Sequence, residues 1–243
     1  MQEELRDSDT GATGTAYDQW PVTIRTFKPR SGRMSLTQRE ALQQDSGRYL
    51  VGSRGWPFIE QRAQDRDIVA DIGFGFGESV LGYAASKPEE LVLGFEIHLP
   101  GVGSLCDALQ REQIDNVVIA QADAQLFLAD EVPDGALAGV RLFFPDPWPK
   151  KRHHKRRFIR EHIVDLLARK IRVGGFLHIA TDVPDYAEDA VGVLESDGRW
   201  QVSAERGRPA HRPQTRFERR AVTAGRPVCD VIARRVGDDA DGR

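Results

Sequence analysis

The chain has 243 residues, of which 29% are charged and 40% are hydrophobic, and its formal net charge is −3. This length is enough to bury a full hydrophobic core, and one α/β domain with short additions is expected. No apolar run approaches the roughly 18 residues of a membrane span, and the polar first residues lack the apolar core of a signal peptide. The two cysteines, Cys106 and Cys229, are far apart and indicate neither a disulfide framework nor a metal site, so a cytoplasmic protein is expected.

Composition divides the chain into four parts. Residues 1–18 contain almost no large apolar side chain and are expected to be a disordered tail, as is the acidic end, 237–243. Residues 19–60 are expected to form a basic N-terminal arm, because the stretch 24–39 has five Lys or Arg and no acid. Such an arm either stays solvated or settles on phosphates. Residues 61–236 are expected to form the folded domain.

A glycine-rich turn follows the first predicted strand of this domain. The apolar run that begins at Asp67 ends in three alternating glycines, Gly73, Gly75 and Gly77, and a helix-like segment follows from Glu78. Glycine tolerates positive φ and lets a ligand approach the backbone, and a helix start offers free N–H groups. The pattern is typical of a loop that binds a nucleotide-like cofactor, although the same turn also occurs for structural reasons alone.

Strands and helices alternate after this turn. Short apolar runs predict strands at residues 91–97, 117–120, 137–144 and 174–180, and apolar side chains at helical spacing predict helices after the first, second, fourth and fifth strands. Two further strands, 200–203 and 227–234, are separated by an Arg-rich linker and are expected to pair antiparallel. The sequence therefore predicts an α/β fold: a doubly wound, mostly parallel sheet with an antiparallel C-terminal strand pair, and ligands at the carboxyl ends of the strands.

Five carboxylates fall at or just past the predicted strand ends and are expected to converge on one rim: Asp71, Glu96, Asp123, Asp146 and Asp182. Each alone is a common loop or helix-cap residue. A nicotinamide dinucleotide would explain Glu96, which lies where a carboxylate accepts hydrogen bonds from ribose, but it prefers the spacing G-x-G-x-x-G. S-adenosylmethionine explains G-x-G-x-G preceded by Asp71, with Asp71 near the amino acid moiety, Glu96 at the ribose and Asp123 at the adenine edge.

A basic stretch follows the fourth predicted strand and the rigid segment Pro145–Trp148. Residues 150–160 contain seven Lys or Arg and no acid, which indicates a polyanionic partner on this face. Positive charge is unfavourable at the start of a helix, so an anion is expected to compensate it. His153 and His154 lack metal-ligand spacing and a nearby cysteine, and no metal site is expected.

Six segments closely resemble the bacterial tRNA (guanine-N7)-methyltransferases, within a match that spans about residues 24–235: 71–77, 94–103, 143–150, 155–157, 180–182 and 215–218. The resemblance implies a Rossmann-like class I methyltransferase. It implies that Asp71, Glu96, Asp123 and Asp146 bind S-adenosylmethionine together with the three glycines, and that Asp146 is also the active-site acid. The implied substrate contacts are Lys150, Asp182, Thr215, Arg216, Phe217 and Glu218, and the implied RNA contacts are Arg152, Lys155, Arg156 and Arg157.

The expected reaction is therefore methyl transfer from S-adenosylmethionine to N7 of a guanine in tRNA, and the resemblance implies the variable loop as its position. Guanine N7 has a lone pair and no proton to lose, so neither a strong base nor a Cys or Ser nucleophile is required. Two alternatives remain open: a nicotinamide-dependent oxidoreductase, and a non-catalytic RNA-binding module on the same fold. No obligatory protein partner is evident.

Overall fold

The structure, a computed structural model, describes residues 26–27, 32–206, 208–210 and 212–237. The expected tail at 1–18 lies outside these residues, and so does the expected tail at 237–243 except for Gly237. Of the acid-free stretch 24–39, residues 24–25 and 28–31 also lie outside them. None of the helices in the described part of the chain is both long and apolar enough to cross a bilayer.

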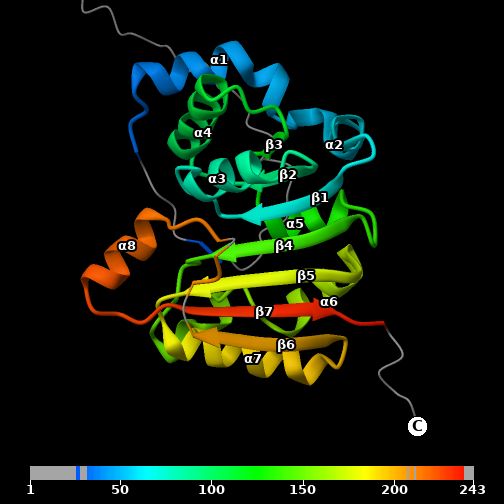
Figure 1. The fold of residues 1–243 in the computed structure, drawn as a ribbon, viewed down its shortest axis with the longest axis vertical. Helices are drawn as coiled ribbons and strands as arrows, with labels where there is room; N and C mark the ends of the chain where they lie inside the picture. The colour runs from blue at the N-terminus through cyan, green and yellow to red at the C-terminus, as the bar shows by residue number, and fades with distance from the viewer. Residues whose placement is uncertain (1–25, 28–31, 207, 211, 238–243) are drawn as a thin grey trace, which may run out of the picture.

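The described strands form a seven-stranded sheet in the order β3-β2-β1-β4-β5-β7-β6 (Figure 1). β1 to β5 pair in parallel, and β7 runs antiparallel to both β5 and β6. This arrangement confirms the mostly parallel, doubly wound sheet with an antiparallel C-terminal pair. The strands are β1 (Asp67–Ile72), β2 (Glu90–Phe95), β3 (Val117–Ala120), β4 (Leu137–Phe143), β5 (Ile171–Thr181), β6 (Trp200–Arg206) and β7 (Cys229–Arg235).

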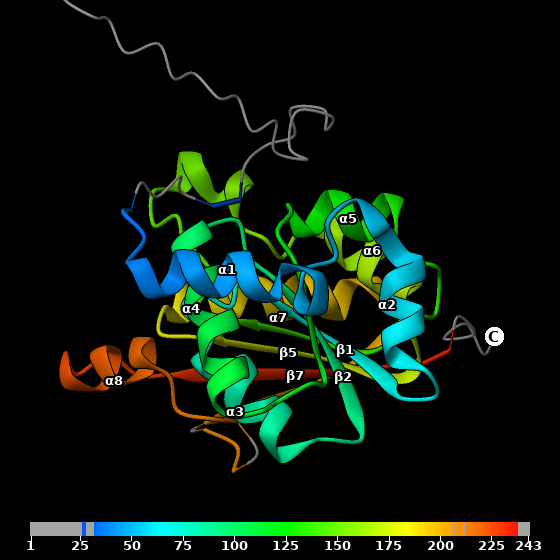
Figure 2. The same cartoon turned by 90° about the horizontal axis from the view of Figure 1, so that it is seen from above.

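Helices cover both faces of the sheet (Figure 2), and alternate residues of each strand contribute to the two cores. In β1, Ile68, Ala70 and Ile72 face the larger core, whereas Val69 faces the other. The larger core is closed by α2 (Gly55–Ala63), α5 (Ala124–Asp130), α6 (Glu161–Lys170) and α7 (Pro184–Asp197). The smaller core is closed by α1 (Leu36–Tyr49), α3 (Glu78–Ser86) and α4 (Leu99–Arg111).

The second half of the expected basic arm is packed on the sheet. Helix α1 lies against α4, and Leu50, directly after α1, forms a parallel bridge with Ile119 at the β3 edge. The next segment includes a short 3-10 helix, η2 (Gly52–Arg54), and α2 then buries Trp56 and Ile59 in the larger core. The proposed boundary at residue 61 stays a prediction.

The four expected helices, α3, α4, α6 and α7, are present, and in the described residues the structure adds four α-helices that the sequence pattern did not predict: α1, α2, α5 and α8 (Arg216–Thr223). Helix α5 has only seven residues, too few for a clear helical period. Helix α8 lies in the expected Arg-rich linker and buries only Glu218 and Ala221, so it has no apolar stripe to detect. The linker is therefore partly helical, and α8 projects beyond the carboxyl ends of β4 and β5 (Figure 1).

One side chain ties three elements together at the amino edge of the sheet. The Asn116 side-chain amide donates to the carbonyls of Ala84, Lys87 and Glu90 at 3.0, 2.9 and 3.0 Å, where α3 ends and β2 begins. Asn116 is buried, so its removal would break three hydrogen bonds that join the end of α3 to the start of β2.

We expect Asn116→Ala to lower the free energy of unfolding by about 1–3 kcal/mol, because a buried side chain loses three hydrogen bonds to the main chain. Urea denaturation followed by circular dichroism measures the change. The matched variant Gln110→Ala, on the exposed surface of α4, should change stability by less than about 0.5 kcal/mol. Equal stability of the two variants would mean that the Asn116 hydrogen bonds do not support the fold.

Candidate active site

The glycine loop between β1 and α3 has the backbone that its sequence predicts. Gly73, Gly75 and Gly77 have φ values of 72°, 62° and 88°, which residues with a Cβ rarely adopt. A Cβ on Gly77 would lie 2.7 Å from a Leu105 methyl carbon, whereas a Cβ on Gly73 would have no heavy atom within 4 Å. The loop is thus packed tightly where α3 begins and is open at Gly73.

The carboxylate of Glu96 holds this loop to the end of β2. Its Oε2 accepts from the Gly75 N–H at 2.7 Å, and its Oε1 accepts from the N–H groups of Ile97 and His98 at 2.8 and 2.9 Å. A carboxylate has about four acceptor positions, so one position on Oε2 is left for a ligand hydroxyl. Glu96 is half-buried beside the open loop, which suits the predicted contact with ribose.

Asp71 lies under the loop and faces a buried arginine. Its Oδ2 is 3.2 Å from Nη1 of Arg141 and accepts from the Ser79 hydroxyl at 3.3 Å. Burial raises the pKa of Asp71 above its usual value, and Arg141 and Ser79 partly offset this effect. In this position Asp71 stabilises the base of the loop through Arg141, and its predicted contact with the cofactor stays a prediction.

Asp123 follows β3 and caps α5. Its Oδ1 accepts from the Gln125 N–H at 2.9 Å. Burial raises the pKa of Asp123, while the backbone hydrogen bonds of Gln125 and Leu126 lower it. Asp123 therefore has a structural role as a helix cap. Its half-buried carboxylate lies at the same edge of the sheet as Glu96.

The loop after β4, residues 144–149, carries Asp146 and is anchored on both sides of it. Before it, the Phe144 N–H donates to Ala180 in β5 at 2.7 Å; after it, the Trp148 indole donates to the Thr26 carbonyl at 2.9 Å. Phe144 and Trp148 have positive φ values of 51° and 45°, a conformation that only strong surrounding contacts maintain. Asp146 is half-buried between these anchors.

Arg157 does not belong to the predicted RNA surface, because its guanidinium is buried and forms hydrogen bonds within the protein. It donates to the Pro147 carbonyl at 3.1 Å and to carboxylate oxygens of Asp185 and Asp189 at the start of α7. Its side chain is only 2% exposed, so it does not fit the predicted contact with RNA. Through the hydrogen bond to Pro147, Arg157 holds the loop that carries Asp146.

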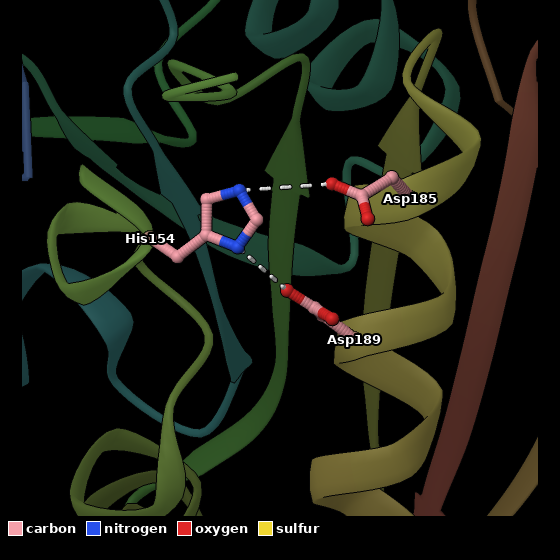
Figure 3. A group of neighbouring side chains, drawn as sticks. All are labelled: His154, Asp185 and Asp189. Carbon is pink, nitrogen blue, oxygen red and sulfur yellow. Dashed lines mark ion pairs between the residues drawn. The ribbon is translucent and has the colours of Figure 1, made fainter. Parts of the chain in front are cut away.

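The same two carboxylates also approach His154 from the basic stretch (Figure 3). The imidazole nitrogens are 3.8 Å from Asp185 and 3.7 Å from Asp189, and the potential ligand atoms of the three residues lie within 4.8 Å of one another. A cation here would have to displace the Arg157 guanidinium from both carboxylates. The cluster is therefore an ion-pair network, and the anions that compensate part of the basic stretch belong to the protein itself.

The remaining predicted RNA contacts stay at the surface. The basic stretch forms a 3-10 helix, η3 (Lys151–Arg156), directly after the Asp146 loop. The guanidinium of Arg156 lies 4.8 Å from the centre of the Trp148 ring. Four of the predicted contacts are exposed: Lys150, Arg152, Lys155 and Arg156.

Helix α8 divides the predicted substrate segment into inward and outward residues. Thr215 is buried and caps α8 by accepting from the Glu218 N–H at 3.3 Å, and buried Glu218 accepts from Arg212 at 2.8 Å. These two positions do not fit direct substrate contact. Arg216 is exposed over the Phe76 ring, and half-buried Phe217 stacks on Phe144 with ring centroids 6.3 Å apart.

Asp182, the last of the five predicted carboxylates, lies just after β5 and is half-buried. Its Oδ2 accepts from Arg226 at 2.7 Å. The structure thus brings all five carboxylates to the carboxyl edge of the sheet, although Asp71 and Asp182 are paired with arginines there.

Sequence reasoning did not identify the buried polar residues beneath this edge. Arg212 binds both oxygens of Asp230 at 2.6 and 3.0 Å, and His178 lies 2.7 Å from the same carboxylate. Arg141 and Arg212 both approach the Phe143 ring. The available signal was weak: Arg141, His178 and Asp230 interrupt otherwise apolar strands, where a polar side chain requires a buried partner.

These features fit S-adenosylmethionine. The loop is bare and open at Gly73, and Glu96 retains an acceptor position next to it. Phe217 of α8 bridges the loops, since it stacks on Phe144 and lies 3.8 Å from the Cβ position of Gly75. The glycine loop, the Asp146 loop and α8 therefore meet at the carboxyl edge of the sheet.

Comparisons with known proteins agree with this arrangement. A family model described as a putative methyltransferase matches residues 65–231. Proteins named tRNA (guanine-N(7)-)-methyltransferase are similar over most of their length: that of Alkalilimnicola ehrlichii is 44% identical, covering 87% of this chain and 92% of its own, and that of Streptomyces coelicolor is 39% identical, covering 96% and 89%. The solved structure of the 16S rRNA methyltransferase KamB shares the fold, with a TM-score of 0.55 and 16% identity, over 88% of this chain and 99% of its own.

The sheet order and the glycine loop define a class I, Rossmann-like methyltransferase. Within that class, the chain belongs to the tRNA (guanine-N7)-methyltransferase family, given the identity and coverage of these relatives. The nicotinamide-dependent alternative is therefore not supported.

The position of the glycine loop depends on a glycine in the helix behind it. A Cβ on Gly101, in α4, would lie 2.1 Å from the Gly75 carbonyl oxygen, far inside van der Waals contact. We expect Gly101→Ala to cost about 1–3 kcal/mol of stability through overpacking, to displace the loop and to weaken S-adenosylmethionine binding by about tenfold or more. Isothermal titration calorimetry measures the affinity.

Gly192→Ala is the matched control, because Gly192 lies within α7 and a Cβ there meets nothing within 4 Å. This variant should bind the cofactor as the wild type does and gain up to about 1 kcal/mol of stability. A folded Gly101→Ala variant with wild-type affinity would show that the close contact does not set the position of the loop.

Proposed function

We propose that this chain transfers the methyl group of S-adenosylmethionine to N7 of a guanine in tRNA, in the variable loop, and that it acts in the cytoplasm. One observation supports the proposal most strongly: the ring of Phe217 stacks on Phe144 of the Asp146 loop and also lies against the glycine loop at Gly75. A cofactor on the glycine loop and a base beside Asp146 would thus be neighbours. The names of the similar proteins support the choice of tRNA and of guanine N7.

The reaction does not require the protein to supply a strong acid or base. S-adenosylmethionine supplies an electrophilic methyl group on a sulfonium ion. The lone pair of guanine N7 forms the new bond to the methyl carbon as the carbon–sulfur bond breaks, and the electron pair of that bond stays on sulfur. No proton leaves N7, so alignment of the two reactants is the main requirement.

The negative charge of Asp146 is proposed to act on the transition state of methyl transfer. Methylation makes the guanine cationic, and a fixed carboxylate beside the base stabilises that charge as it develops. Phe144, Trp148 and the Arg157 bond to Pro147 fix the loop, so little reorganisation is needed during the reaction. Arg216 and Phe217 are the α8 residues proposed to contact the base or its neighbours, with Asp182 at the same rim.

RNA is proposed to lie along the exposed side of η3. Lys150, Arg152, Lys155 and Arg156 are close to the Asp146 loop in the chain and are exposed, so they are free to approach phosphates. Arg157 is not included, because it is buried.

The test of the proposal is nucleoside mass spectrometry of tRNA treated with the protein and S-adenosylmethionine. We expect one 7-methylguanosine per substrate tRNA, mapped to the variable loop by digestion into oligonucleotides. Binding of tRNA and cofactor without any methylated product would instead favour the non-catalytic RNA-binding module.

We expect Asp146→Ala to lower the single-turnover rate of methylation by roughly 100-fold, because the charge interaction is strongest as the base becomes cationic. The affinity for tRNA should fall much less, which filter binding measures. Asp146→Asn keeps the shape and removes the charge, and it should show the same loss. Equal losses of rate and affinity would make Asp146 a residue that only positions the base.

We expect Arg156→Gln to weaken tRNA binding and to reduce the slope of log K against log salt by about 1, since one phosphate contact releases its counterions. Fluorescence anisotropy across a salt series measures the slope. Arg111→Gln removes the same charge from the exposed end of α4 and should leave the slope unchanged. An unchanged slope in both variants would place the RNA elsewhere.

A further inference from the structure

A concave site lies at the edge of the sheet opposite the candidate active site. It has a volume of about 490 Å³ and is formed by the end of α1, the end of α2 and the segments that lead into β1 and β3: Arg48, Gln61, Arg62, Gln64, Arg66 and Asp115. We call it the arginine hollow. β1 separates it from the glycine loop, and six residues of strand span about 20 Å. The arginine hollow is therefore distinct from the candidate active site.

Main-chain hydrogen bonds fix two of its three arginines. Arg62 donates to the carbonyl oxygens of Arg48, at 2.6 Å, and of Asp115. Arg66 donates to the carbonyl oxygens of Ala63, at 3.3 Å, and of Arg62, at 2.5 Å. Neutral carbonyl groups hold these guanidiniums in place but do not cancel their charge.

The positive charge of the arginine hollow is only partly compensated. Within the described part of the chain, none of its three guanidiniums forms an ion pair with a carboxylate, and Asp115 is the one acid in the lining. Burial lowers the pKa of Arg62, and repulsion from Arg48 and Arg66 lowers it further, against the attraction of Asp115. A bound anion would relieve this repulsion.

We propose that the arginine hollow binds a phosphate group, with Arg48, Arg62 and Arg66 as its cationic partners. Guanidinium groups match phosphate oxygens with paired N–H donors, and the amides of Gln61 and Gln64 supply further donors. The hollow is open, since Arg48, Gln61, Gln64 and Asp115 are exposed, so the group can be a free phosphate or part of an RNA backbone. The RNA source rests on the proposed function, because a bound tRNA extends well beyond its target base.

The first measurement is a titration of the full-length protein with inorganic phosphate at constant ionic strength, followed by NMR chemical shifts or calorimetry. Arg48→Gln is the informative variant, because Arg48 is exposed and its removal leaves the backbone contacts of Arg62 and Arg66 in place. It should weaken phosphate binding by about tenfold, and Arg66→Gln should act in the same direction. Arg169→Gln, which removes a charge at the end of α6 outside the hollow, should change the affinity by less than about twofold.

The second measurement identifies the source of the phosphate. If it belongs to RNA, Arg48→Gln reduces the salt slope of tRNA binding by about 0.7–0.9, whereas Arg169→Gln does not. If the phosphate is a free anion, Arg48→Gln leaves the salt slope of tRNA binding unchanged and lowers only the affinity for phosphate. Both results support the site. The proposal is overturned if the wild type does not bind phosphate saturably and the two variants share one salt slope. Methylation by the wild type is measured separately, so failure of the proposed function is distinguishable.

Discussion

Two buried guanidiniums set the geometry beneath the candidate active site. Arg141 and Arg212 lie 4.8 and 5.6 Å from the centre of the Phe143 ring, and both are almost fully buried. A buried charge is tolerated only with a close partner, so Arg141 requires Asp71, and Arg212 requires Asp230 and Glu218. These pairs join β4 to β1 and the β6–β7 connection to β7. The positions of the glycine loop and of α8 follow from the same requirement.

This requirement explains why α8 exists. Both α6 and α7 pack into the larger core, which leaves the other face of β4, β5 and β7 without a crossover helix. On that face the strands carry Arg141, His178 and Asp230, and in the described structure the β6–β7 connection covers them through Arg212. Glu218 binds Arg212 from within α8, so the polar layer holds the first turn of α8 beside the glycine loop. Helix α8 is thereby placed by ion pairs together with the stacking of Phe217 on Phe144.

A similar use of charge organises the rim that the substrate is proposed to meet. The basic stretch after β4 has two parts: exposed side chains along η3, and the buried Arg157, which Asp185 and Asp189 neutralise. Arg157 in turn binds the Pro147 carbonyl and keeps the strained loop around Asp146 in place. Exposed charges and the anchor of the Asp146 loop are thus built from neighbouring residues.

The sequence alone determined the strands in chain order, the helices that follow β1, β2, β4 and β5, the glycine loop and the carboxylates at the strand ends, because periodicity and φ requirements are local properties. It also determined the family, through short motifs such as residues 143–150. Only the tertiary structure decided which charges face outward: Arg156 and Arg157 are adjacent in sequence, yet one is exposed and the other buried. It likewise decided that Thr215 and Glu218 face inward. The reason is that the partner of a buried charge lies far away in the chain, as Asp230 does from His178, and sequence spacing does not reveal such a partner.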